Sequence, residues 1–223
     1  MSFMSETTSG VIKGEEVPQV DLLPELDEIC SLVVRTCEYF FKGKMRMENA
    51  PFKGFILEGP PGTGKTEIVK QAARRLDTVL GAVYLKMVDG ASIAAPRWGD
   101  AERRLRQVFE KADDTNRDSK IIILFDDIEC LMITRGVELA KEWHYSINSI
   151  LFHELDSLDP YHTIVCATSN RIDLVDQALK TRLHPITAPS LTLEQLKGIV
   201  EDILDAGEIS QHDRDHILKL VIE

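Results

Sequence analysis

Short apolar runs alternate along the chain with longer segments in which apolar residues recur every three or four positions. A run of about four to eight apolar residues is typical of a buried β-strand, and the longer spacing is typical of an amphipathic helix. We therefore predict strands at residues 54–58, 82–88, 121–126, 163–168 and 185–188. Helices are predicted before and between them, at residues 24–41, 65–76, 100–113, 137–155 and 173–179.

The order of these elements predicts the fold class, because strands separated by helices form parallel βαβ units. We expect an α/β fold, a three-layer sandwich with a central parallel five-stranded sheet. Residues 1–22, rich in Ser, Thr, Gly and Glu, are predicted to form a flexible leader. Residues 23–189 are then the α/β core, and residues 190–223 a short helical segment.

Residues 59–66 carry the strongest chemical signal, the phosphate-loop pattern G-x-x-x-x-G-K-[ST] between a predicted strand and a predicted helix. Gly62 and Gly64 allow backbone N–H groups to turn toward a polyphosphate, and the N-terminus of the new helix adds positive potential. An ordinary glycine turn is the alternative. The pattern predicts P-loop NTPase chemistry, and the predicted nucleotide-binding residues are Gly59, Pro60, Pro61, Gly62, Thr63, Gly64, Lys65, Thr66 and Glu67.

Polar residues follow two of the apolar strands. Asp126 and Asp127 end the strand at 121–126, and Asn170 follows the strand at 163–168. In P-loop enzymes an acid at the end of this strand holds Mg²⁺ opposite the Thr66 hydroxyl, and we assign this role to Asp126. The next acid polarises the attacking water, and we assign that role to Asp127. Asn170 would hold that water or contact the γ-phosphate. Alternatively these residues merely end strands, since Asp and Asn favour turns.

With these motifs in this order, the chain resembles the AAA+ ATPases, and most closely their AAA branch, from about residue 23 to residue 196. Residues 59–66 resemble Walker A and residues 121–127 resemble Walker B. Residues 167–171, Ala-Thr-Ser-Asn-Arg, are similar to the sensor 1 motif, in which Asn170 is the functional residue.

The resemblance implies a ring-shaped homo-oligomer, usually a hexamer, that binds ATP and Mg²⁺ between neighbouring subunits. Lys65, Asp127 and Asn170 are implied to act from one subunit. Arg182, at the position that resembles the family's arginine finger, is implied to act from the next. A solvated charge at a helix end is the alternative for Arg182. The implied function is coupling of ATP hydrolysis to the remodelling of a macromolecule, most often a protein.

Three features depart from the family pattern. Asp127 stands where the family usually has Glu, which predicts slow hydrolysis unless Glu129 compensates. Arg97 and Trp98 occupy the pore-loop positions; Trp98 would either grip a substrate or pack beneath the loop. The C-terminal segment is short for the family's helical lid, so the lid is truncated or is completed by a partner.

Composition narrows the choice of partner. The formal net charge of −11 disfavours nucleic acid as the main partner. One rival function is nevertheless a DNA-associated loader, in which Arg97 and the arginines of residues 103–106 would lie near the DNA strand. An ATP-gated assembly switch with little turnover is another. No apolar stretch has the length of a membrane span, and the four cysteines lack a C-x-x-C pairing. We therefore expect a cytoplasmic protein with packing thiols.

Overall fold

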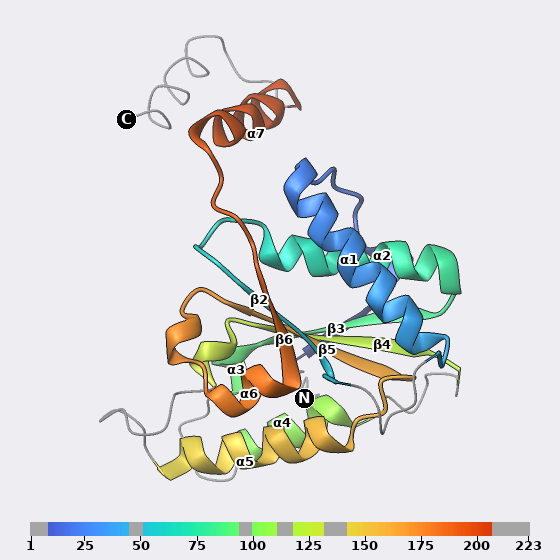
Figure 1. The fold of residues 1–223 in the computed structure, drawn as a ribbon, viewed down its shortest axis with the longest axis vertical. Coiled ribbons are helices and arrows are strands. Elements are labelled where there is room, and N and C mark those ends of the chain that lie inside the picture. Colours follow the sequence, from blue (N-terminus) through green and yellow to red (C-terminus); the bar gives the residue numbers. More distant parts are fainter. Residues whose placement is uncertain (1–8, 45–50, 94–99, 111–117, 132–141, 207–223) are drawn as a thin grey trace, which may run out of the picture. The chain divides into compact units, whose positions relative to one another are not determined.

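The computed structural model describes residues 9–44, 51–93, 100–110, 118–131 and 142–206 (Figure 1). The chain divides into two compact units, Met1–Ala188 and Pro189–Glu223. In the second unit, helix α7 (Leu193–Ala206) begins with a reciprocal cap. The backbone N–H of Thr192 donates to the Gln195 side chain at 2.9 Å, and the backbone N–H of Gln195 donates to the Thr192 hydroxyl at 3.2 Å.

The first unit is built on a six-stranded sheet with the strand order β1-β3-β4-β5-β2-β6. Five strands, from β3 to β6 in that order, are parallel to their neighbours, and β1 pairs antiparallel with β3. The strands are β1 (Ser9–Lys13), β2 (Gly54–Glu58), β3 (Val83–Asp89), β4 (Lys120–Asp126), β5 (Thr163–Ser169) and β6 (Leu183–Thr187).

Strand β1 corrects two predictions. The sheet has six strands rather than five, and residues 9–13 belong to it rather than to a flexible leader. The reason is that Ile12 packs against the core while the strand pairs with β3, some seventy residues away (for example, Ser9 lies opposite Val88). The sequence does not predict this strand because Val11 and Ile12 are only two adjacent apolar residues, too few to form the apolar pattern of a strand.

Helices cover both faces of the sheet and give the three-layer arrangement (Figure 1). Leu57 and Cys166 pack in the cluster of α1 (Pro24–Phe41) and α2 (Lys65–Leu80). Ile56 and Val165 pack in the cluster on the opposite face. Successive strand residues point to opposite faces, so two apolar layers form from nearly continuous apolar strands. The opposite face is covered by α3 (Gly90–Ile93), α4 (Asp100–Phe109), α5 (Glu142–Ser157) and α6 (Gln177–Arg182). The predicted α/β class and layering are confirmed.

Most helix predictions are close to the observed bounds. Helix α1 has the predicted bounds, and α2 runs four residues further than predicted, to Leu80. Gly81 follows in the left-handed conformation, with φ 79°, and ends the helix. The predicted helix at 173–179 is instead a 3₁₀ turn, Ile172–Leu174, followed by α6. Asp176 causes the restart, because its side chain accepts a hydrogen bond from the backbone N–H of Ala178 at 2.8 Å.

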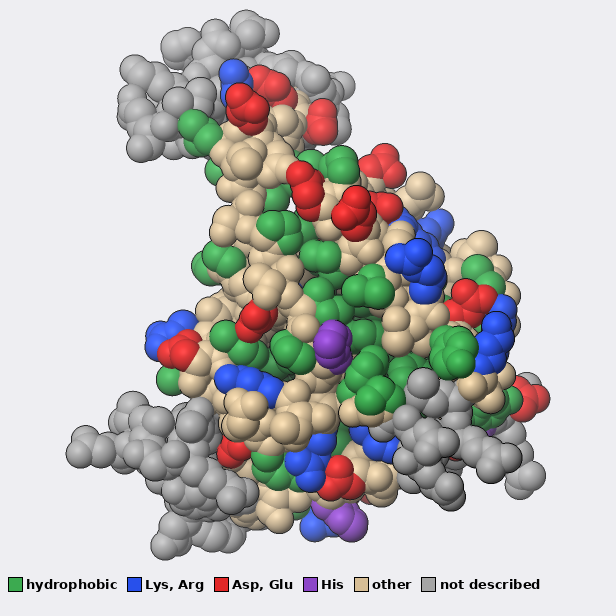
Figure 2. Space-filling view, in the orientation of Figure 1, with side chains coloured by type: hydrophobic (Ala, Val, Ile, Leu, Met, Phe, Trp, Pro, Cys, Tyr) green, Lys and Arg blue, Asp and Glu red, His purple; other side chains and the backbone are tan. Residues whose placement is uncertain are grey.

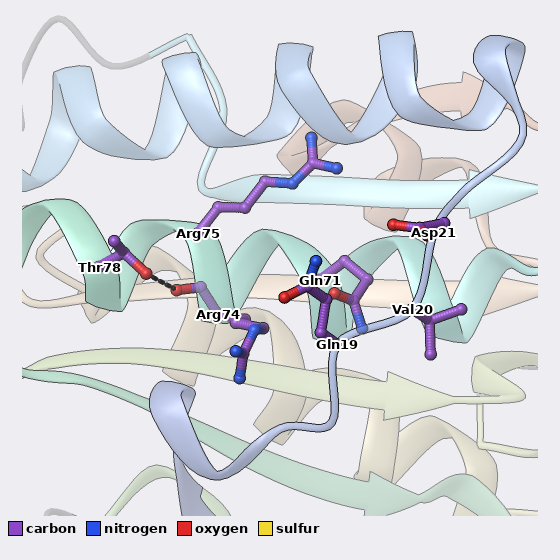
Figure 3. A pocket seen from close by; sticks show the side chains of 7 residues that line it. All are labelled: Gln19, Val20, Asp21, Gln71, Arg74, Arg75 and Thr78. Atoms are coloured by element: carbon purple, nitrogen blue, oxygen red, sulfur yellow. Dashed lines mark hydrogen bonds between the residues drawn. The ribbon is translucent and has the colours of Figure 1, made fainter.

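The segment between β1 and α1 is fastened along α2. Asp77 accepts hydrogen bonds from the backbone N–H of Glu15 (2.8 Å) and of Val83 (2.9 Å). Arg74 donates to the carbonyls of Glu15 (3.1 Å) and Val17 (2.7 Å). A pocket of ≈ 260 Å³ remains between the segment and the helix, and Figure 3 shows its lining residues Gln19, Val20, Asp21, Gln71, Arg74, Arg75 and Thr78.

The core also contains three cysteines. Cys30, Cys37 and Cys166 are buried free thiols, as expected for packing residues, and Cys130 is exposed. Burial raises the pKa of Cys30 to about 11 and that of Cys166 to about 12, so both thiols stay protonated and unreactive near neutral pH. No helix among the described residues is long and apolar enough to cross a membrane.

Candidate functional site

The loop between β2 and α2 has the backbone conformation that a phosphate cradle needs. Gly59, Gly62 and Gly64 have φ values of 148°, 77° and 81°, a region that side chains disfavour. A Cβ atom at Gly59 would also lie 2.6 Å from the carbonyl oxygen of Ala188. Gly64 precedes the first turn of α2 and has no side chain to cap it. The N–H groups of that turn therefore face the loop, where an anion would bind.

Lys65 is folded into this loop, with a residue exposure of only 6%. Its ammonium donates to the carbonyls of Gly59 (2.9 Å) and Pro60 (2.7 Å) and to Oδ1 of Asn170 (2.7 Å). Burial lowers the pKa of Lys65, and the carboxylate of Asp127 partly offsets this effect. The structure thus brings the predicted phosphate-binding lysine and the predicted sensor together, across 105 residues of sequence.

Asp126 lies beside Thr66, as predicted for a magnesium site. Its Oδ1 accepts hydrogen bonds from the hydroxyls of Thr66 (2.8 Å) and Thr168 (2.5 Å). Hydroxyl and carboxylate oxygens are the ligands that Mg²⁺ prefers. No group of three or more His, Cys, Asp and Glu side chains in the described part of the chain is arranged for a metal. The residues therefore fit an ion that takes its remaining ligands from nucleotide phosphate and water.

Asp127 adopts an unusual backbone conformation, with φ 52° in the left-handed region. Its backbone N–H donates to the Thr168 hydroxyl at 3.1 Å, and its Oδ1 accepts from Nδ2 of Asn170 at 2.9 Å. Burial raises the pKa of Asp127, and the nearby carboxylates of Glu129 and Asp126 raise it further. A carboxylate with a raised pKa is suited to polarising water as a general base.

Two further residues connect the site. Thr168 links Asp126 to the backbone of Asp127, and Oε1 of Glu129 accepts from the backbone N–H of Asn170 at 2.9 Å. The other oxygen of Glu129 is buried without a hydrogen-bond partner among the described residues. The signal for Thr168 was a hydroxyl near the end of a mostly apolar strand, two residues before the sensor asparagine. Glu129 thus positions Asn170 through its backbone.

Arg182 lies apart from these residues. Leu183, which follows it, pairs with Gly54 at the start of β2, whereas Gly59 follows the end of β2. Five strand residues separate the two places, a distance of about 16 Å at the usual rise per residue. Arg182 is paired instead with Asp156, whose two carboxylate oxygens each accept a hydrogen bond at 2.8 Å.

Two predicted residues cannot be placed. Arg97 and Trp98, assigned to the pore loop, lie outside the described residues. The roles assigned to them stay predictions.

Comparison with known proteins decides the family. The sequence model described as "ATPase family associated with various cellular activities (AAA)" matches residues 55–189, more than half of the chain. The chain belongs to the AAA ATPase family. The assignment made from the phosphate loop, the Asp126–Asp127 strand and the Asn170 segment is confirmed.

Over the aligned segments, curated AAA relatives are about one-third identical to this chain. A protein of Bifidobacterium adolescentis, described as "AAA ATPase forming ring-shaped complexes", is 32% identical over 174 residues, which are 74% of this chain and 34% of that protein. A protein of Corynebacterium urealyticum with the same description is 34% identical over 140 residues, 58% of this chain and 26% of the relative. The chain therefore spans between a quarter and a third of these relatives.

One solved structure has the same fold. It is titled "Structure of E. coli MS115-1 HORMA:CdnC:Trip13 complex". The superposition has a TM-score of 0.68 and covers 95% of this chain and 79% of that chain. At 14% sequence identity, the likeness supports the AAA fold alone.

Proposed function

We propose that this AAA chain hydrolyses ATP at a site shared between neighbouring subunits of a homo-oligomeric ring. The separation of Arg182 from the phosphate loop, at opposite ends of β2 and β6, carries this proposal. A rigid sheet keeps the two apart within one subunit. Arg182 can therefore reach an ATP molecule only when that molecule is bound to another subunit.

Each residue at the phosphate-loop end has a role in this proposal. Lys65 and the first N–H groups of α2 hold the phosphates, and an incoming phosphate replaces some of the lysine's present carbonyl partners. Thr66 and Asp126 would hold Mg²⁺, which neutralises the phosphate charge. Asp127 orients and polarises the attacking water, and Asn170 fixes Asp127 and Lys65 relative to each other.

The same geometry supports slow turnover. Asp127 has one methylene fewer than the Glu that is usual in the family, and Asn170 holds its carboxylate in place. A short and tethered base reaches the water less well. We infer that the chain hydrolyses ATP slowly unless a partner or substrate shifts this contact.

We further infer that the ring is a hexamer and remodels a protein. The description of the curated relatives, "forming ring-shaped complexes", supports self-association. DNA is the less favoured partner. The arginines of α4 make contacts of their own, Arg103 with Asp100 at 3.3 Å and Arg104 with the Ser92 carbonyl at 2.8 Å. On the face shown in Figure 2, basic and acidic side chains are mixed rather than gathered in a basic tract.

The test is ATP turnover as a function of protein concentration, for the chain and for Arg182→Ala. We expect specific activity to rise with protein concentration. We expect it to fall about 10³-fold in the variant, a typical loss of kcat when an arginine finger is removed. High turnover that ignores both concentration and Arg182 would overturn the shared site. Tight ATP binding with negligible turnover at every concentration would instead favour an assembly switch. Stimulation by unfolded protein rather than DNA would support the proposed substrate.

A further inference from the structure

Arg182 is held by side chains and backbone from two adjacent helices, α5 and α6 (Figure 1). Its Nε and one terminal nitrogen each donate to a carboxylate oxygen of Asp156 at 2.8 Å. Its other terminal nitrogen donates to the carbonyl of Ala178 at 3.0 Å. The guanidinium carbon also lies 4.8 Å from the centre of the Phe152 ring. Asp156 and Phe152 lie one turn apart on α5, so they approach the guanidinium together.

These contacts fix the direction of the guanidinium and leave part of it unused. An arginine side chain has five N–H donors in one plane. Asp156 takes two and Ala178 takes one, so two donors have no hydrogen-bond partner among the described residues. The two-pronged pair with Asp156 fixes the plane as well as the position. The remaining donors therefore point in a set direction, available to an anion on another molecule.

The exposure of this pair argues against a role in folding alone. The side chain of Asp156 is 56% exposed and that of Arg182 is 26% exposed. Pairs as open to water as this one contribute little to stability. A free arginine, in contrast, loses much rotamer freedom when it binds a phosphate. An arginine that is already fixed has lost this freedom before its partner arrives.

We propose that Asp156 is the positioning residue for Arg182, aiming its unused N–H donors at ATP held by the neighbouring subunit. The inference rests on the proposed shared site and adds a residue that acts through Arg182. The hydrogen bonds from Arg182 lower the pKa of Asp156, so the carboxylate stays ionised at neutral pH. The pair therefore persists at the pH at which the enzyme would work.

The test is the Asp156→Asn substitution in the full chain. The amide cannot accept the two-pronged pair, so kcat at saturating protein concentration is expected to fall about tenfold, as for a misplaced catalytic group. The KM for ATP changes less than kcat, because the phosphate loop is untouched, and the melting temperature stays unchanged, because the pair is open to water. Asp156→Glu, which keeps the carboxylate, recovers part of kcat. In the Arg182→Ala background, Asp156→Asn has no further effect, because its action requires the arginine.

A matched control is Glu38→Gln, which breaks a surface carboxylate–lysine pair between Glu38 on α1 and Lys42 just after it. We expect no change in kcat, because the side chain of Glu38 pairs with Lys42 and with neither Arg182 nor Asp156. If turnover is too low to follow, the protein concentration at half-maximal ATP-dependent self-association replaces it. Asp156→Asn then raises that concentration severalfold, because a misdirected Arg182 binds the neighbour's ATP less well.

Several results would overturn the inference. A rise in turnover with Asp156→Asn would mean that Asp156 sequesters Arg182. An equal loss in the Arg182→Ala background would mean that Asp156 acts through the fold. If Asp156→Asn changed neither turnover nor self-association, Asp156 would have no role in positioning Arg182. These outcomes differ from failure of the shared site itself, in which Arg182→Ala alone has no effect.

Discussion

The two ends of the central sheet are built in contrasting ways. At the carboxyl ends of β2, β4 and β5, side chains from three loops bond to one another, and Lys65 is almost fully buried. At the other end, Arg182 and Asp156 form a partly exposed pair next to the start of β6. The first end has the groups that would hold and polarise a phosphate, and the second presents a cation. The contrast is what the proposed shared site requires, in which each subunit would supply one half to each of two sites.

The largest effect is expected when subunits with complementary defects are mixed. Lys65→Ala removes the phosphate-loop half, and Arg182→Ala removes the arginine half. Each variant alone should lose turnover about 10³-fold. In an equimolar mixture of randomly assembled rings, about a quarter of the interfaces combine two intact halves, because a head-to-tail contact uses a different surface from each subunit. Phosphate release should therefore recover well above that of either variant.

The control for this mixture is a chain with both substitutions. Mixed with either single variant, it contributes no intact half and should restore nothing. Failure of the two single variants to complement each other, although they assemble together, would show that Arg182 does not act across a subunit boundary.

The next largest effect concerns the phosphate-loop end alone. Asp127→Asn removes the carboxylate that we propose polarises water, so turnover should fall about 10²-fold, within the range for a positioned base. ATP affinity should be retained, which titration with a fluorescent ATP analogue would measure. Because burial and neighbouring acids disfavour the ionised form of Asp127 in the fold, losing its charge should leave the melting temperature at pH 7 unchanged or higher.

The raised pKa of Asp127 also predicts the acid side of the pH profile. A raised pKa means that the folded protein takes up the proton at a higher pH than an ordinary aspartate does. Turnover should therefore decline, as the pH falls, sooner than ordinary aspartate titration predicts. An acid limb at the ordinary aspartate pKa, or full activity of Asp127→Asn, would contradict the role given to this residue.

The two ends also differ in how far the sequence predicts them. The phosphate loop is local, because Gly62, Gly64 and Lys65 lie within a few residues and need a strand before them and a helix after them. The contact of Thr66 with Asp126 follows from parallel strands, whose carboxyl ends meet at one edge. The pair of Arg182 with Asp156 depends on how α5 packs against α6, and no local pattern encodes that packing.

The same distinction explains the missed strand and the missed threonine. Strand β1 is short and lies at the edge of the sheet, and it is specified by its pairing with β3 rather than by apolar periodicity. Thr168 is recognisable only when its hydroxyl is seen between Asp126 and the backbone of Asp127. Long-range partners of this kind emerge from tertiary structure.

The smallest effect tests whether the N-terminal segment stabilises the fold rather than taking part in the chemistry of the phosphate-loop end. Asp77 has a residue exposure of 5% and accepts two backbone N–H groups, from Glu15 and Val83. Asp77→Ala would leave both without this acceptor and should lower the free energy of unfolding by about 2 kcal/mol, measured by urea denaturation. Asp77→Asn keeps one acceptor oxygen and should lose about half as much.

ATP affinity of the folded Asp77→Ala protein should stay unchanged, because none of the atoms that hold Lys65 contacts Asp77 in the described structure. A loss of ATP affinity without loss of stability would mean that the N-terminal segment shapes the phosphate loop itself. The segment before α1 would then belong to the phosphate-loop end, and the difference between the two ends of the sheet would depend on that segment as well as on the strands.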